Sequence, residues 1–400
     1  MNTNITIKKS NLSSLAMLVL ALSPMLFYYY IGDGKITILI LLGFFLLIGL
    51  CLSGQFSFKK IPNTYLLYWG WCTIQLYTIA GISGWSDYLP GGILLCVFSI
   101  LLVVMVQLLN FDKLYHYMRL IFIISSLLLF IQYAIYYLDG SILFLVPPLT
   151  DNIGGETIGE LMERNARPII GGGVRFSSIF MEPSYFGQYG LVLLTMELFS
   201  NKNKEKLYTK FSLFIIATLL VLRSGIGLLG LTIIGVVKVI YIIFTTKNTK
   251  YYALLSIMIP AVFVVFQYYL ASSSGSYVAS RMNELDASNE QGSGFSRIFF
   301  GWNYFSELDL KSKVLGTSRN YALGFENGFS NMVTYVVTSQ GIIGLGLLIR
   351  FYIKECVKKP FIVWALVITL TTIALIEACY LGGLMLIVSV IVIGARYNRV

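Results

Sequence analysis

The sequence predicts an all-α, polytopic integral membrane protein with about 12 transmembrane helices and two long extracytoplasmic loops. Composition is the first observation behind this prediction. Of the 400 residues, 57% are hydrophobic and only 12% are charged, which is more apolar residue than a soluble domain of this size uses. The second observation is that apolar residues recur in runs of about twenty, enough for a helix to cross a hydrocarbon core roughly 30 Å thick. We therefore treat residues 1–400 as a single membrane domain.

Twelve apolar runs can be delimited along the chain. The first has the length of a signal peptide, but no small-residue cleavage site follows it, so we interpret it as a retained span. The seventh is short, and only residues around Glu377 separate the last two. The predicted spans are 12–30, 36–52, 63–81, 91–109, 118–138, 184–199, 208–222, 226–244, 251–270, 327–349, 361–376 and 378–395.

The net charge of +10 follows the connections between these spans. Lysine-rich connections alternate with lysine-poor ones, and all the lysine-rich ones share one side if the N-terminus is cytoplasmic. The positive-inside rule describes this alternation, so we expect both termini in the cytoplasm. The surplus charge then faces the membrane lipids of the inner leaflet, and no nucleic-acid partner is expected.

Arginine is enriched in the connections assigned to the outside, which include the long loops 139–183 and 271–326. Ten of the 29 basic residues fall outside and seven of these are arginine, whereas 15 of the 19 cytoplasmic ones are lysine. Arginine presents a planar, permanently charged fork that matches phosphate oxygens. Anion binding explains this set, and a solvated mixed-charge loop explains each member taken singly. The external arginines are Arg164, Arg167, Arg175, Arg223, Arg281, Arg297 and Arg319.

The stretch from Arg175 to Gly187 joins the first long loop to the sixth span. Pro183 suits the first turn of a helix, where its missing N–H is not needed. Glu182 then lies at the helix N-terminus, where the positive end of the dipole favours a carboxylate. Arg175 is close enough in the chain to approach it. A helix cap beside a snorkelling arginine is the plainer interpretation of the same pair.

Both long loops are expected to contain a short helix. In the first, residues 160–168 form an amphipathic pattern, and the glycines at 171–173 predict a hinge. In the second, apolar and aromatic residues recur at helical spacing over 297–305, which suits a helix lying on the membrane interface. Trp302 in this segment suits headgroup anchoring and also stacking on a sugar ring. Glu326 and Asn327 open the tenth span as Glu182 opens the sixth.

We expect no metal and no other cofactor. The five cysteines lie in apolar runs or at their edges, and the only histidine, His116, falls on the cytoplasmic side. The acid pairs Glu284/Asp286 and Glu307/Asp309 lack further donors, and we interpret them as solvated.

Ionisable residues inside the spans are almost absent. Lys238, Glu197 and Glu377 lie near predicted helix ends, from which they can snorkel. A transporter of a charged substrate usually has charges or broken helices near the midplane of the membrane. The pattern therefore favours an enzyme that works at the membrane surface.

Several short motifs resemble those of bacterial O-antigen and capsular polysaccharide polymerases, the Wzy-type family. They are Arg175-x-Ser177-x-x-Phe180-x-Glu182-Pro183-Ser184-x-x-Gly187, Ser293-Gly294-x-x-x-Arg297, Arg223-Ser224-Gly225, and Gly316 to Asn327 followed by Gly341-Ile-Ile-Gly344. The resemblance covers the whole chain in architecture, with its spans and two long external loops.

This resemblance implies a glycosyltransferase of the bacterial plasma (inner) membrane that acts in lipopolysaccharide or capsule biosynthesis. It would join polyprenyl-pyrophosphate-linked oligosaccharide repeat units at the outer face, with undecaprenyl pyrophosphate as the leaving group. Arginines at the rim of the bilayer suit the charge that develops on that leaving group. The family also implies a chain-length regulator protein as a partner.

The expected site combines residues of both long loops. Glu182 or Glu326 orients or deprotonates the acceptor hydroxyl, but the helix dipole lowers their basicity, which favours an arginine-orienting role for Glu182. The expected catalytic residues are Arg175, Glu182, Arg297, Arg319 and Glu326. The expected substrate-binding residues are Arg164, Arg167, Arg223, Arg281, Trp302 and Asn327.

Two other functions stay open. O-antigen ligases share the architecture but usually carry a functional histidine in the last large external loop, and this chain has none there. A lipid-linked oligosaccharide exporter or non-catalytic scaffold is the other alternative, for which charges inside the spans are the expected sign.

Overall fold

The structure is a computed structural model that describes residues 9–31, 36–54, 56–57, 61–83, 85–153, 155–166, 174–203, 205–246, 300–317 and 331–395. It is mostly helical (75%), as predicted. Three of the described helices are long and apolar enough to cross a membrane: α5 (Phe111–Asp139), α9 (Gly225–Thr246) and α16 (Met332–Cys356). The chain is thus compatible with a membrane-embedded protein, and the count of twelve spans stays a prediction.

Other helices occupy the remaining predicted spans that the described residues cover. They are α1 (Lys9–Leu26), α2 (Ile38–Leu52), α3 (Asn63–Ser83), α4 (Trp85–Leu108), α7 (Pro183–Phe199), α8 (Lys210–Leu222), α17 (Phe361–Ala374) and α18 (Gly383–Gly394). The ninth predicted span, 251–270, lies outside the described residues. Three further helices belong to the long loops: α6 (Ile158–Ala166), α13 (Gly301–Glu307) and α14 (Leu310–Leu315). The two predicted loop helices are therefore present, and α14 was not predicted.

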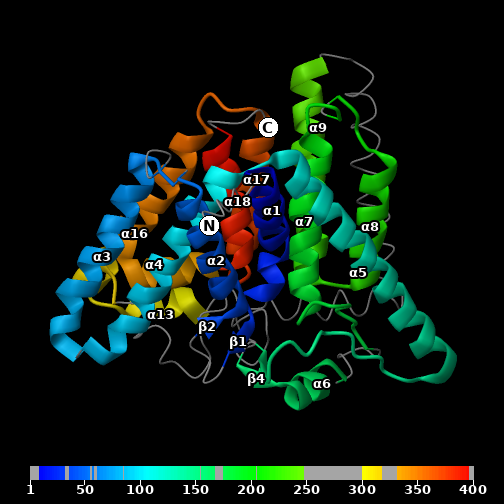
Figure 1. Ribbon diagram of the computed structural model, residues 1–400, viewed down its shortest axis with the longest axis horizontal. Coiled ribbons are helices and arrows are strands. Elements are labelled where there is room, and N and C mark those ends of the chain that lie inside the picture. Colours follow the sequence, from blue (N-terminus) through cyan, green and yellow to red (C-terminus); the bar gives the residue numbers. More distant parts are fainter. Residues whose placement is uncertain are drawn as a thin grey trace, which may run out of the picture.

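Two helices form the centre of the bundle. Pro183 and every residue from Phe186 to Phe199 are buried in α7, and every residue of α18 is buried. α7 packs against α5, α8, α9 and α17, whereas α18 packs against α1, α4, α16 and α17. In Figure 1, α3, α4 and α16 lie on one side of this centre and α5, α8 and α9 on the other.

The outer helices expose apolar side chains. Phe45 on α2 is 69% exposed and Phe244 on α9 is 76% exposed, and Leu127 on α5 is also exposed. A helix at the surface of a water-soluble protein turns its polar face outward. Broad apolar exposure on several helices instead suits contact with lipid.

A small sheet at one end of the bundle departs from a purely helical fold. β1 (Tyr29–Ile31), β2 (Ile36–Thr37), β3 (Asn152–Ile153) and β4 (Glu156–Thr157) pair antiparallel in the order β2-β1-β3-β4. Tyr29 lies opposite Ile153, so the sheet ties the chain after α1 to the first long loop. A separate cluster of buried side chains, which includes Val146 and Leu161, packs beside it. The first long loop therefore has a small core of its own.

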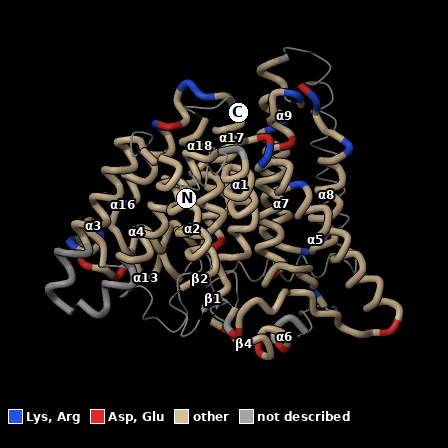
Figure 2. The backbone as a smooth tube through the Cα atoms, viewed as in Figure 1, with Lys and Arg blue, Asp and Glu red and all other residues tan. Residues whose placement is uncertain are grey.

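The two ends of the bundle differ in charge. Figure 2 shows basic residues gathered at the end that holds the α7–α8 and α16–α17 connections, with Lys202 and Lys206 in the first and Lys358 and Lys359 in the second. Acidic residues predominate at the opposite end, around α6 and β4. This asymmetry has the sense that the lysine pattern predicts.

The snorkelling predicted for Lys238, Glu197 and Glu377 is wrong, because their exposed fractions are only 1%, 6% and 7%. The Lys238 Nζ donates to the Leu198 carbonyl at 2.5 Å, where carbonyls at the end of α7 lack helical donors. The Glu197 carboxylate accepts from Thr209 Oγ1 at 2.5 Å, and also from the Tyr115 hydroxyl. Local hydrogen bonds therefore keep Lys238 and Glu197 inside the bundle.

Candidate functional site

The start of α7 is the best-defined part of the predicted site. Glu182 is the N-cap residue, with φ −138° and ψ 152°, and Pro183 occupies the first turn, as predicted. The Glu182 carbonyl accepts from the N–H groups of Tyr185 and Phe186 at 3.2 and 3.3 Å. Its carboxylate accepts from Ser184 Oγ at 3.0 Å. Glu182 therefore stands half-buried at the positive end of a helix dipole.

The turn before α7 is held by α5. Ser178 has a left-handed backbone with φ 58°, and its N–H donates to Gln132 Oε1 at 3.0 Å. Phe176 packs edge-on against the Tyr133 ring at 4.9 Å, and Phe180 stacks on Phe186 at 4.9 Å. These contacts fix the backbone between Arg175 and Glu182, which is what positioning of a reacting group requires.

Arg175 and Arg223 approach the same side chain of α5. Arg223 is the exposed C-cap of α8, with φ 53°, and Arg175 is half-buried beside Phe176. Both guanidinium groups lie within electrostatic range of the Tyr133 hydroxyl. Two of the predicted external arginines, from different loops, therefore act on one tyrosine of α5. The arginine-orienting role of Glu182 stays a prediction.

Gly187 lets the start of α7 lie close to the turn that carries Arg223. A Cβ atom on Gly187 would lie 3.2 Å from Ser224 Oγ and 3.6 Å from the Gly227 nitrogen. The first turn of α7 thus contacts the turn between α8 and α9 almost backbone to backbone. A larger side chain at position 187 would push the two turns, and the arginines beside them, apart.

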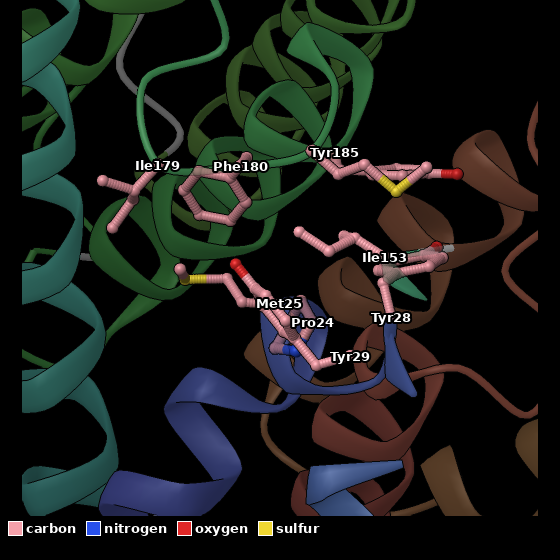
Figure 3. Close-up of a pocket in the computed structure, with 9 residues that line it drawn as sticks. Pro24, Met25, Tyr28, Tyr29, Ile153, Ile179, Phe180 and Tyr185 are labelled. Atoms are coloured by element: carbon pink, nitrogen blue, oxygen red, sulfur yellow. The ribbon is translucent and has the colours of Figure 1, made fainter. Parts of the chain in front are cut away.

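An aromatic pair joins the end of α1 to the start of α7. The rings of Tyr28 and Tyr185 stack at 4.6 Å with an angle of 11° between their planes. They line a small, mainly apolar pocket, across which Ile179 and Phe180 face the end of α1 at Met25 (Figure 3). The Glu182 turn is therefore anchored on three helices: α1, α5 and α7.

The turn between α17 and α18 links this place to the start of α16. The Tyr28 hydroxyl lies within electrostatic range of Tyr185, Glu182 and Cys379. Cys379 Sγ lies 3.4 Å from Met332 Sδ, and the Met332 N–H donates to the Glu377 carbonyl at 3.0 Å. The helices α7 and α16, which follow the two long loops, therefore both begin near the turn between α17 and α18.

The remaining predicted site residues are less defined. Trp302 on α13 is 41% exposed and packs edge-on against Phe305 at 6.1 Å, which leaves its ring accessible. Arg164 lies on α6, and its side chain is outside the described part of the structure. Outside the described residues altogether are Arg167, Arg281, Arg297, Arg319, Glu326 and Asn327.

Sequence analysis missed three residues at this site. Gln132 and Tyr28 hold the turn around Glu182, and Tyr133 lies within electrostatic range of the two arginines. A glutamine inside an apolar span was the available signal, because a buried amide needs hydrogen-bond partners. Among the described residues, no group of three or more His, Cys, Asp and Glu side chains could hold a metal ion. The expectation of a metal-free site stays a prediction.

The sequence matches no protein-family model and no curated protein. The fold therefore defines a helical bundle compatible with a membrane protein, with a polar site at one end. The resemblance of the sequence to polysaccharide polymerases rests on the short motifs and stays a prediction.

Proposed function

We propose that this protein is a polysaccharide polymerase, a glycosyltransferase that joins polyprenyl-pyrophosphate-linked repeat units at the outer face of a bacterial plasma membrane. The observation that carries the proposal is that Arg175 and Arg223 both lie within electrostatic range of Tyr133, with Arg175 just before the start of the largely buried α7. A guanidinium group binds two phosphate oxygens through two parallel N–H donors. Two guanidinium groups near one tyrosine therefore suit a pyrophosphate leaving group.

Charge and position support this reading of the site. Arg175 lies in the loop that carries α6, around which acidic residues predominate, and Arg223 caps the end of α8 that is away from the lysine-rich α7–α8 connection. If the lysine-rich end faces the cytoplasm, the site faces outward, where a lipid-linked glycan would present its pyrophosphate at the headgroup level. The proposed orientation places both termini in the cytoplasm.

The residues divide into two proposed roles. Arg175 and Arg223, with Arg297 and Arg319 of the second loop, bind the donor pyrophosphate and stabilise its departing charge. Glu182, half-buried at the α7 N-terminus, orients the acceptor hydroxyl or an arginine. The common turn between α17 and α18 would allow Glu326, which precedes α16, to act with them.

The interruption of α16 at Gly341, inside its predicted span, favours the exporter instead. Broken helices often mark substrate sites in transporters. Here, however, the carbonyls before the break are occupied by donors of the chain itself. The polymerase is therefore the better account, and the experiment below separates the two.

The test is the length of surface polysaccharide in cells that lack the gene and carry each variant at matched protein level. Arg175→Lys keeps the charge but loses the fork. Removing one such contact from a transition state costs about 2–4 kcal/mol, roughly a hundredfold or more in rate, so we expect single-repeat chains. Arg223→Lys should shorten the chains as well.

Arg350→Lys is the matched control, because Arg350 is exposed on the cytoplasmic-side part of α16, and it should give full-length ladders. Full-length ladders from both Arg175→Lys and Arg223→Lys would contradict the proposal. Complete loss of surface glycan in the deletion strain would point to an exporter. Long polymer retained on the lipid carrier would point to a ligase.

A further inference from the structure

The helix α16 is interrupted in the middle of its length. Gly341 has φ 73° and ψ 176°, far from helical values, while the helix continues on both sides from Met332 to Cys356. Carbonyl groups in the turn before such a break lack their usual donors. In a membrane-embedded bundle, backbone groups without partners are costly, so donors must come from elsewhere in the chain.

Three consecutive carbonyls before Gly341 receive these donors. The donors come from two other elements, α3 and the segment 314–317 at the end of α14. The pairs are Thr317 N–H and Oγ1 to the Thr338 carbonyl at 2.9 and 3.1 Å, Gln75 Nε2 to Ser339 at 2.5 Å, and Trp71 Nε1 to Gln340 at 2.9 Å. The break is thus a joint between three segments that are distant in sequence.

Gln75 connects all three segments. Its Nε2 group also donates to the Leu315 carbonyl at 2.6 Å, so one amide nitrogen bonds a carbonyl of the 314–317 segment and a carbonyl of α16. The side chain is only 5% exposed. Its two N–H groups are therefore bonded to the chain and shielded from water. A side chain without donors at this position would remove these partners from the Leu315 and Ser339 carbonyls.

Two glycines let the backbones approach closely enough. A Cβ on Gly341 would lie 2.1 Å from the Val314 carbonyl oxygen. A Cβ on Gly316, whose φ is 89°, would lie 2.5 Å from the Ser339 carbonyl oxygen and 2.2 Å from Gln75 Nε2. Both contacts are far inside van der Waals distance. Only glycine fits at either position without moving the backbone opposite.

We propose that Gln75, Gly316 and Gly341 form a latch that fixes the end of α14, within the second long loop, in the break of α16, with Gln75 as a positioning residue. The latch sets where the chain leaves α14 relative to the start of α16. Its importance for polymerisation rests on the proposed function, because that loop contributes Arg319 and Glu326 to the proposed site. The latch itself requires no particular reaction.

Hydrogen exchange of the full-length protein in lipid nanodiscs tests the latch directly. In the unaltered chain, the Thr317 amide should be protected by its bond to Thr338. Gln75→Leu keeps the size of the side chain but removes both donors. We expect exchange of the peptide 310–317 to rise by about tenfold or more, while peptides from α7 and α18 stay protected.

Gly341→Ala disturbs the same joint independently, through the contact with Val314, and should raise exchange in the same peptide. Gly346→Ala is its matched control, because a Cβ there meets nothing within 4 Å. Gln107→Leu is the control for Gln75→Leu, since Gln107 is also buried but contacts Ser57 and Val103. Both controls should leave the peptide protected.

Unchanged exchange at 310–317 in both Gln75→Leu and Gly341→Ala would overturn the latch. If Gln75→Leu fails to insert in the membrane, Gln75→Asn, which keeps the donors on a shorter arm, and Gly341→Ala decide the question. Polysaccharide length provides the second readout. Raised exchange with full-length ladders would leave the latch standing and would count against a catalytic role for the second loop.

Discussion

Gln132 of α5 holds the backbone of Ser178 and the chain after α5 together, because its Oε1 accepts the Ser178 N–H at 3.0 Å while its Nε2 donates to the Leu143 carbonyl at 2.8 Å. Gln132 is 2% exposed. One side chain therefore joins both ends of the first long loop to a single helix. The position of Arg175 and Glu182 depends on this buried amide.

Gln132→Leu should destabilise the protein by about 1–3 kcal/mol, because it leaves the Ser178 N–H and the Leu143 carbonyl unpaired in the interior. Thermal unfolding in detergent measures the loss. Ile131→Ala is the control, since Ile131 is 47% exposed on the outer face of α5 and should change the melting temperature little. Equal melting temperatures for Gln132→Leu and Ile131→Ala would show that the amide does not hold the turn.

Substitutions at Gly187 should separate the two arginines. Gly187→Leu forces the start of α7 away from Ser224, and overpacking of this kind costs about 1–3 kcal/mol. We expect lower thermal stability and shorter surface polysaccharide, with Gly187→Ala intermediate because its Cβ meets Ser224 Oγ at 3.2 Å. Gly235→Leu on α9 is the matched control, since a Cβ there meets nothing within 4 Å.

The start of α6 should loosen in acid. Hydrogen bonds from the Thr157 N–H and hydroxyl, at 2.8 and 2.9 Å, hold the pKa of Glu160 below its usual value. Because this pKa is lower in the folded state, the bonds stabilise α6 at pH values above the unfolded-state pKa of about 4.3. The stabilisation is lost as the pH falls through the folded-state pKa. Amide exchange over 157–161, corrected for intrinsic rates, should therefore rise below about pH 4.

Glu160→Gln is the control for this acid transition, because an amide does not titrate in that range. Its exchange over 157–161 should not depend on pH after the same correction. A steep acid transition that persists in Glu160→Gln would assign the effect to another group.

Reporter fusions test the orientation of the chain. Because lysines gather at the α7–α8 connection and acids near α6, fusions at residues 160 and 300 should report the outside and one at 205 the cytoplasm. A cytoplasmic signal at 160 or 300 would remove the basis for the proposed site, because both loops must face the same compartment.

The sequence alone determined where most of the described helices lie. Apolar runs long enough to cross a bilayer can bury their backbone hydrogen bonds only as helices, so the runs at 118–138 and 226–244 appear as α5 and α9. Local chemistry likewise predicted that α7 begins at Glu182 and Pro183. These features depend on residues that are neighbours in the chain, which is why a linear pattern encodes them.

Only the tertiary structure decided which distant residues meet. Gln132 reaches Ser178, Gln75 reaches Ser339, and Cys379 contacts Met332, because helix packing brings these elements together. Lys238 looked free to snorkel by its position near a helix end, yet carbonyls at the end of α7 supply it with buried partners. Side-chain partners across a bundle depend on which faces pack, and that information is distributed over the whole chain.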